Sequence, residues 1–269
     1  DAFDYGEPTN WASVNTTTVR DADLANGSTI WVADRPEGKN EYFEAWTTQV
    51  SSSESSTVTH WTTYNTWVHF SGTHHTQKVT TTSTSTLYSY TVKADHQVGT
   101  SFLSGTNTIV IESGKSVLLG GAVNAQGGSV SLIAGNNILN QSGAAAITGA
   151  SNLTLKAASG TIGSEGSAIK WTAAGSSDKP LNLIATAGKS IYIDAKNLNS
   201  GASVSGSLNA GETVSAEFRG GVDLNSLSGQ KLSLVSQEGG INIKSLDHKE
   251  ASDLSQRLDL TAAGDISLK

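Results

Sequence analysis

Short runs in which two aliphatic residues flank a third residue recur throughout positions 101–269. This alternation places both aliphatic side chains on one face of an extended chain, which is the period of a β-strand and not of a helix. We therefore predict ten short strands: Ile109–Ile111, Val130–Leu132, Leu153–Leu155, Leu181–Leu183, Ile191–Ile193, Val222–Leu224, Leu232–Leu234, Ile241–Ile243, Leu258–Leu260 and Ile266–Leu268.

Turns of small residues, such as Ala157–Gly160 and Ala262–Asp265, separate these strands. Glycine and asparagine there supply the positive φ angles of sharp corners. Corresponding strands recur about every 21 to 28 residues, a period typical of solenoids. We predict an all-β protein in which residues 101–269 form a right-handed parallel β-helix of roughly six to seven coils, with three strands per coil. A β-sandwich is the alternative fold, because it too is built from evenly spaced short strands.

Three coils of this region resemble a known family. Leu153–Gly163, Pro180–Gly188 and Leu258–Leu268 are similar to the degenerate coils of large exported bacterial adhesins of the filamentous-haemagglutinin type, which include the stalks of contact-dependent inhibition proteins. The resemblance covers residues 105–269. It implies a right-handed β-helix, a secreted or cell-surface location and an adhesive or spacer role, and it carries over no functional residues. Asn197–Arg219 departs from the regular coil, so we expect an insertion or a loop leaving the helix there.

Residues 46–100 have a different pattern, in which threonine occupies both faces of the predicted strands. Threonine and aromatic residues favour strands, but a segment that is polar on both faces has little core of its own. We predict strands at 46–50, 57–62, 66–70 and between 78 and 92. They would form a projecting antiparallel β-hairpin extension, with turns at Ser51–Ser56 and Ser71–Gly72.

Aromatic residues are concentrated in residues 1–100, and seven of them lie in this extension. Two interpretations are open, since such residues stabilise hairpins through cross-strand pairs and also form binding surfaces for partners or sugar rings. The candidate binding residues are Trp46, Trp61, Tyr64, Trp67, Phe70, Tyr88 and Tyr90.

Five histidines in the same half invite a metal hypothesis: His60, His69, His74, His75 and His96. A zinc site needs three or four converging ligands. The neighbours His74 and His75 would point to opposite faces of a strand, and only His60 and His69 could face each other across a hairpin. We therefore expect no metal site.

Residues 1–45 contain a turn signal, Asn26–Gly27, between Val19–Leu24 and Thr29–Val32. Strands there would form a first coil or a cap, which the end of a solenoid needs. The predicted domains are therefore 1–45, 46–100 and 101–269.

Composition excludes several classes of protein. The net charge of −7 argues against a nucleic-acid surface, which needs clustered basic residues. The chain has no cysteine, and therefore neither disulfides nor a thiolate site. No apolar run is long enough to insert into a membrane. The phosphate-binding, dinucleotide-binding and serine-hydrolase motifs are also missing, so we expect no cofactor.

Acidic residues in positions 101–269 are scattered, whereas β-helical polysaccharide lyases and hydrolases need carboxylates on one face. Asp194 with Asp223, one rung apart, and Glu212 with Glu217, in one loop, are the pairs that could meet. We expect these acids to be solvated and the protein not to be an enzyme.

Together these features predict a segment of a large secreted adhesin, whose partners would be a receptor or glycan on a host or neighbouring cell. The resemblance also implies an outer-membrane export partner for the parent protein. One alternative is the stalk and receptor-binding segment of a contact-dependent toxin-delivery protein. The other is a β-helical lyase or hydrolase.

Overall fold

A computed structural model describes residues 16–20, 29–33, 41–51, 55–64, 72–78, 86–94, 97–104, 108–125, 127–141, 146–172, 181–248 and 257–269. Their regular secondary structure is entirely β-strand, which confirms the all-β prediction. Within these residues no helix is long and apolar enough to span a membrane.

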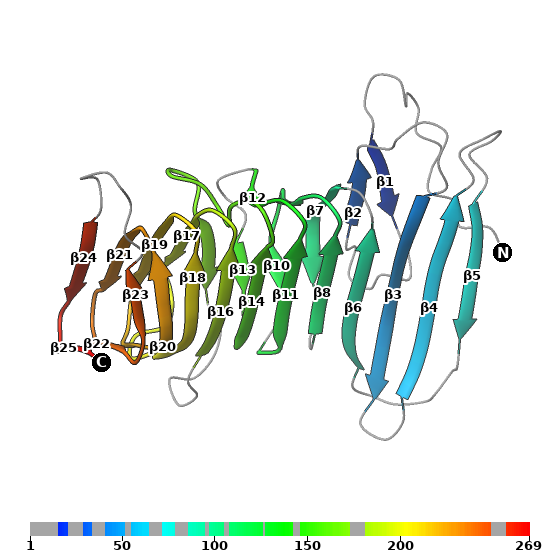
Figure 1. Ribbon diagram of the computed structural model, residues 1–269. Helices are drawn as coiled ribbons and strands as arrows, with labels where there is room; N and C mark the ends of the chain where they lie inside the picture. The colour runs from blue at the N-terminus through cyan, green and yellow to red at the C-terminus, as the bar shows by residue number, and fades with distance from the viewer. Residues whose placement is uncertain are drawn as a thin grey trace.

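The strands form two long sheets that run side by side along the molecule (Figure 1). The first, here called sheet A, contains β1 (Thr16–Arg20), β2 (Thr29–Ala33), β7 (Gln97–Ser104), β9 (Val117–Leu119), β10 (Val123–Asn124), β12 (Ile138–Asn140), β13 (Ala146–Thr148), β15 (Ile169–Thr172), β17 (Ile191–Ala195), β19 (Thr213–Phe218), β21 (Lys231–Ser236) and β24 (Arg257–Ala262). The second, sheet B, contains β3 (Glu41–Ser51), β4 (Ser55–Tyr64), β5 (Gly72–Lys78), β6 (Thr86–Ala94), β8 (Thr108–Ser113), β11 (Ser129–Ala134), β14 (Asn152–Ala157), β16 (Leu181–Ala187), β18 (Val204–Ala210), β20 (Val222–Gly229), β22 (Ile241–Ile243), β23 (Leu246–His248) and β25 (Ile266–Leu268).

The pairs that strands β6 to β25 form with one another are all parallel, because each strand stacks on the corresponding strand of the next coil, whereas β6 and β7 also pair antiparallel with β3 and β2. The result is a β-solenoid of about six turns. The predicted parallel β-helix is therefore confirmed, and the sandwich alternative is wrong. Three strands per coil hold only for the early coils, such as β11, β12 and β13, whereas later coils such as β18 with β19 have two. The right-handed sense stays a prediction.

All ten strands predicted from aliphatic alternation are present. Their inward residues stack in columns, one of which runs through Ile111, Leu132, Leu155, Ala185, Leu208 and Leu227, each with no exposed surface. Burying one aliphatic side chain contributes about 1.5 to 3 kcal/mol, and the column repeats this gain at each coil. The largest fully buried side chains are Trp171 and Phe218, both on sheet A.

The observed coils vary more in length than the range predicted from the sequence. Stacked residues are 18 positions apart between Val204 and Val222 and 30 apart between Asn152 and Asn182. Only the strands must keep their register with the core, so the turns between them can differ in length.

No loop leaves the solenoid at 197–219, and that prediction is wrong. The segment contains β18 and β19, which pair on both sides with their neighbours. The inward positions of β18 include Gly206 and Ala210 in place of large aliphatics, which hides the strand pattern. Gly206 has φ of 146°, and a Cβ atom there would lie 1.8 Å from the Leu183 carbonyl oxygen. Glycine is needed because the backbones approach so closely.

The N-terminal region continues both sheets beyond the first coils. In sheet A, β1 and β2 are antiparallel and β2 pairs with β7, so the predicted strands at 19–24 and 29–32 are present in part. In sheet B, β3 pairs antiparallel with β4 and β6, and β4 with β5. These strands form an antiparallel extension, as predicted. The predicted turn at Ser71–Gly72 is wrong at Gly72, which lies in β5, and the predicted strand at 66–70 lies outside the described residues. Since β6 also pairs with β8, the extension is continuous with the solenoid (Figure 1). The three domain boundaries stay a prediction.

Candidate functional site

A difference in the number of residues between stacked core positions produces a turn on the outward face of sheet A. Ile162 and Ile169 belong to one coil and stack on Ile191 and Ile193 of the next. In the sequence only Tyr192 lies between Ile191 and Ile193, whereas residues 163–168 lie between Ile162 and Ile169. Both isoleucines of each pair must face the core, and all four are buried. The surplus residues are therefore extruded outward as a turn beside Tyr192.

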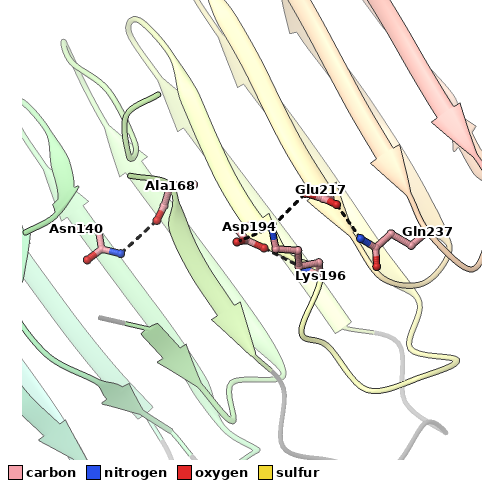
Figure 2. Close-up of polar contacts among 6 residues, drawn as sticks. All are labelled: Asn140, Ala168, Asp194, Lys196, Glu217 and Gln237. Carbon is pink, nitrogen blue, oxygen red and sulfur yellow. Dashed lines mark hydrogen bonds and ion pairs between the residues drawn. The ribbon is translucent and has the colours of Figure 1, made fainter. Parts of the chain in front are cut away.

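Hydrogen bonds hold this turn in place. Ser164 and Ser167 form an antiparallel bridge that closes it. Asn140 of the preceding coil donates from Nδ2 to the Ala168 carbonyl oxygen at 3.2 Å (Figure 2). The backbone carbonyl oxygen of Asn140 accepts a hydrogen bond from Ser167 Oγ at 2.9 Å. Gly163 has φ of 68°, and a Cβ atom there would lie 2.6 Å from the Tyr192 carbonyl oxygen. The turn thus packs directly on the next coil.

The extruded turn forms one end of a groove on the outward face of sheet A, with a volume of about 610 Å³. Its floor is one rank of stacked residues: Tyr192, Ser215, Ser233 and Asp259. The rank on one side consists of Lys170, Asp194, Glu217 and Val235, and the rank on the other of Thr213, Lys231 and Arg257. The two central floor residues are serines, which are the smallest side chains of that rank.

An ionic network lies along one side of the groove (Figure 2). The Lys196 ammonium is 3.3 Å from Asp194 Oδ2 and 3.5 Å from Glu217 Oε2, and Gln237 Nε2 donates to Glu217 Oε1 at 2.7 Å. The hydrogen bond and charge of Asp194, with a further contribution from Glu217, raise the pKa of Lys196 above its ordinary value. Lys196 therefore stays charged and joins two coils.

Charges in the groove balance one another. The lining contains four basic and four acidic side chains: Lys170, Lys196, Lys231, Arg257, Glu165, Asp194, Glu217 and Asp259. Besides the Lys196 network, Arg257 Nε lies 2.5 Å from Asp259 Oδ2. The groove therefore offers many hydrogen-bonding groups with no formal net charge.

Neither carboxylate pair considered from the sequence forms. Asp194 lies on β17 in sheet A and Asp223 on β20 in sheet B, so they are not one rung apart. Glu212 lies in the turn before β19, and Glu217 lies near the far end of that strand. The stacked acidic pair is Asp194 with Glu217, because these two are register partners. Both residues lie in strands, but the sequence alone does not show which residues of successive coils stack on each other.

The register distributes the predicted aromatic binding residues over both faces of sheet B. Trp46 and Trp61 align with Thr59 and Glu44, which places them on one face, whereas Tyr64, Tyr88 and Tyr90 fall on the other. That second face continues into the solenoid interior, since Tyr90 is the register partner of Ile109. Trp67 and Phe70 lie outside the described residues. The binding role of all seven residues stays a prediction.

Three of the predicted histidine positions lie in described strands. His60 aligns with Ala45 and Thr76, His74 with Thr62 and His75 with Trp61, so no two of these histidines are register partners. His69 and His96 lie outside the described part of the chain. Within that part, no group of three or more histidine, aspartate or glutamate side chains is placed to hold a metal ion.

Comparison with known proteins adds no family: neither the protein-family models nor the curated proteins nor the solved structures include a significant match to the chain.

Proposed function

We propose that this chain is a non-enzymatic, rod-forming segment of a large exported bacterial surface adhesin of the filamentous-haemagglutinin type. The observation that carries the proposal is the uninterrupted solenoid of about six turns. A rod of stacked coils separates binding elements from the surface that bears them, and weak contacts repeated along it add up to firm attachment.

The antiparallel extension of β3, β4, β5 and β6 would recognise a receptor or glycan on a host or neighbouring cell. It lies at one end of the rod (Figure 1). The end of a rod is the part that a partner contacts first. Trp46 and Trp61 are the best candidates for contact, because the register places them on the face of sheet B that is opposite to the solenoid interior. Large aromatic residues contribute most to binding when they lie at the centre of an interface.

The same architecture would serve the stalk and receptor-binding segment of a contact-dependent toxin-delivery protein. In both versions the parent protein is secreted through an outer-membrane partner and the chain acts by reach and recognition. The two differ in what the parent protein delivers, which lies outside the residues of this chain.

A second candidate function, a polysaccharide lyase or hydrolase, is favoured by one observation, the stacked carboxylates Asp194 and Glu217 beside a groove. Glycosidases use two carboxylates about 5 to 10 Å apart, one of which must carry a proton. Here a single ammonium, that of Lys196, contacts both carboxylates, and Glu217 also accepts from Gln237. Both carboxylates are thus already engaged by side chains of the protein, so the proposal remains a binding protein.

The test is adhesion of the intact chain to cells and to a glycan array, beside the variants Trp46→Ala and Trp61→Ala. Thr48→Ala is the matched control, because Thr48 lies on the same face of β3 as Trp46. We expect the tryptophan variants to bind about tenfold more weakly with unchanged melting temperatures, and the control to bind normally. Unchanged binding by both tryptophan variants would contradict the assignment of recognition to this face.

Release of reducing ends or unsaturated products from the array glycans, abolished in Asp194→Asn and Glu217→Gln, would contradict the non-enzymatic proposal and establish the second candidate.

A further inference from the structure

We propose that the groove on the outward face of sheet A binds an uncharged oligosaccharide. This site belongs to the solenoid itself and is separate from the antiparallel extension. The proposal rests on the shape of the groove, on the chemistry of its lining and on its charge balance.

The shape fits a short polymer. The floor runs from Tyr192 to Asp259 across β17, β19, β21 and β24, which is three strand spacings or about 14 Å. The volume of about 610 Å³ lies within the range of small-molecule sites. One end is defined by the turn at 163–168, which is hydrogen-bonded to the preceding coil, so this wall exists before a ligand arrives.

The lining combines one aromatic residue with many hydrogen-bonding groups. Tyr192 offers an apolar ring for the C–H face of a sugar, and its phenol offers a polar group at the edge. Ser215 and Ser233 line the floor with small hydroxyl groups and leave space above them. The carboxylates and amines on one side, and the hydroxyl and basic groups on the other, match a ligand that presents hydroxyl groups in several directions, unlike the mostly apolar lining of a typical pocket.

Charge balance selects an uncharged ligand. Basic and acidic side chains are equal in number around the groove. Lys196 contacts both Asp194 and Glu217, and Arg257 pairs with Asp259. A charged group that approached these five residues would compete with their ion pairs, whereas a hydroxyl group can use their remaining lone pairs and protons. Since the pairs also fix the side chains, the hydrogen-bonding groups lose little freedom on binding.

The experiment titrates the full chain with neutral tetrasaccharides of glucose, galactose, mannose and N-acetylglucosamine, and with tetragalacturonate and a sulfated heparin tetrasaccharide as acidic comparators. Binding is followed by saturation-transfer NMR and calorimetry at low and high salt. Ser233→Trp fills the groove floor, Tyr192→Ala removes the ring, and Ser207→Trp on the outward side of β18 in sheet B is the matched control. Melting temperatures verify that each variant is folded.

At least one neutral tetrasaccharide is expected to bind with an affinity that salt changes little, since no ion pair forms with the ligand. Tyr192→Ala should weaken binding about tenfold, Ser233→Trp should abolish it, and Ser207→Trp should leave it unchanged. If Ser233→Trp fails to fold, Tyr192→Ala still decides the question.

The proposal is overturned if none of the neutral tetrasaccharides binds, if only the acidic comparators bind, or if Tyr192→Ala binds as the unaltered chain does. These outcomes leave the rod and its extension untouched, because that proposal is tested at Trp46 and Trp61.

Discussion

The two faces that the solenoid turns to solvent share one backbone architecture and differ in chemistry. On sheet B no turn interrupts the outward rank of Thr154, Ile184 and Ser207, and the outward positions contain mainly hydroxyl and amide side chains. On sheet A the rank of Tyr192 is interrupted by the turn at 163–168, and charged residues border the resulting groove. A solenoid can thus acquire a site without altering its core, provided that the flanking residues keep their stacking positions.

The largest expected effect concerns the interior, which the two faces share. Leu155→Asp in sheet B and Val214→Asp in sheet A each bury an unpaired carboxylate, since both residues have no exposed surface. Each should destabilise the protein by several kcal/mol and unfold neighbouring coils. Thr154→Asp, on the outward side of β14, should be tolerated. Thermal melts followed by circular dichroism check this, and equal behaviour of Leu155→Asp and Thr154→Asp would refute the inward and outward assignments.

A smaller effect should appear where strand β18 packs closely against its neighbour β16 within sheet B. Gly206→Ala requires a Cβ atom 1.8 Å from the Leu183 carbonyl oxygen and a positive φ, which should cost about 2 to 3 kcal/mol. Gly221→Ala is the matched control, because the nearest atom to its Cβ is 3.8 Å away and its φ is ordinary. Chemical denaturation measures both. Equal stability of the two variants would show that β18 does not pass over β16 as described.

The strands were predictable wherever large aliphatics alternate, because that pattern depends only on which face meets the core. β18 was missed since an inward position is Gly206, whose absent side chain reflects a close backbone contact and not a turn. β15 was missed although Ile169, Lys170 and Trp171 show the same alternation.

The groove could not be predicted, because it depends on which coil stacks on which. One signal was present: Ile162 and Ile169 are seven positions apart, whereas their partners Ile191 and Ile193 are two apart. That difference becomes informative only when the register is known. The pairing of Asp194 with Glu217 depends on the same register.

A modest effect is expected at the turn that distinguishes sheet A from sheet B. Asn140→Ala removes a hydrogen bond to the Ala168 carbonyl oxygen and should cost about 1 kcal/mol. Amide hydrogen exchange should accelerate within residues 163–168 and remain unchanged in β14. Asn182→Ala, on the outward side of β16, is the control and should affect neither region. Unaltered exchange in the turn would mean that Asn140 does not anchor it.

The smallest effect belongs to the ionic network. Lys196→Met should destabilise the protein by no more than about 1 kcal/mol, because the network is largely solvated. The pKa of Lys196 is raised above 10.5, so its stabilisation is complete below that pH and disappears as the pH rises through the folded-state value. The difference in melting temperature between the two proteins should be constant near neutral pH and shrink in strong alkali. A difference that grows with pH would contradict this sign.

The central claim, one continuous stack in two sheets, is tested most directly by distances between spin labels, for which the chain offers a background without cysteine. Lys156→Cys with Asp247→Cys spans four strand steps in sheet B. Lys170→Cys with Thr261→Cys spans four in sheet A. Both pairs should give a single distance near 19 Å between backbones, lengthened by the labels. Two unlike distances, or either one beyond about 35 Å, would contradict the stacked register on which the groove depends.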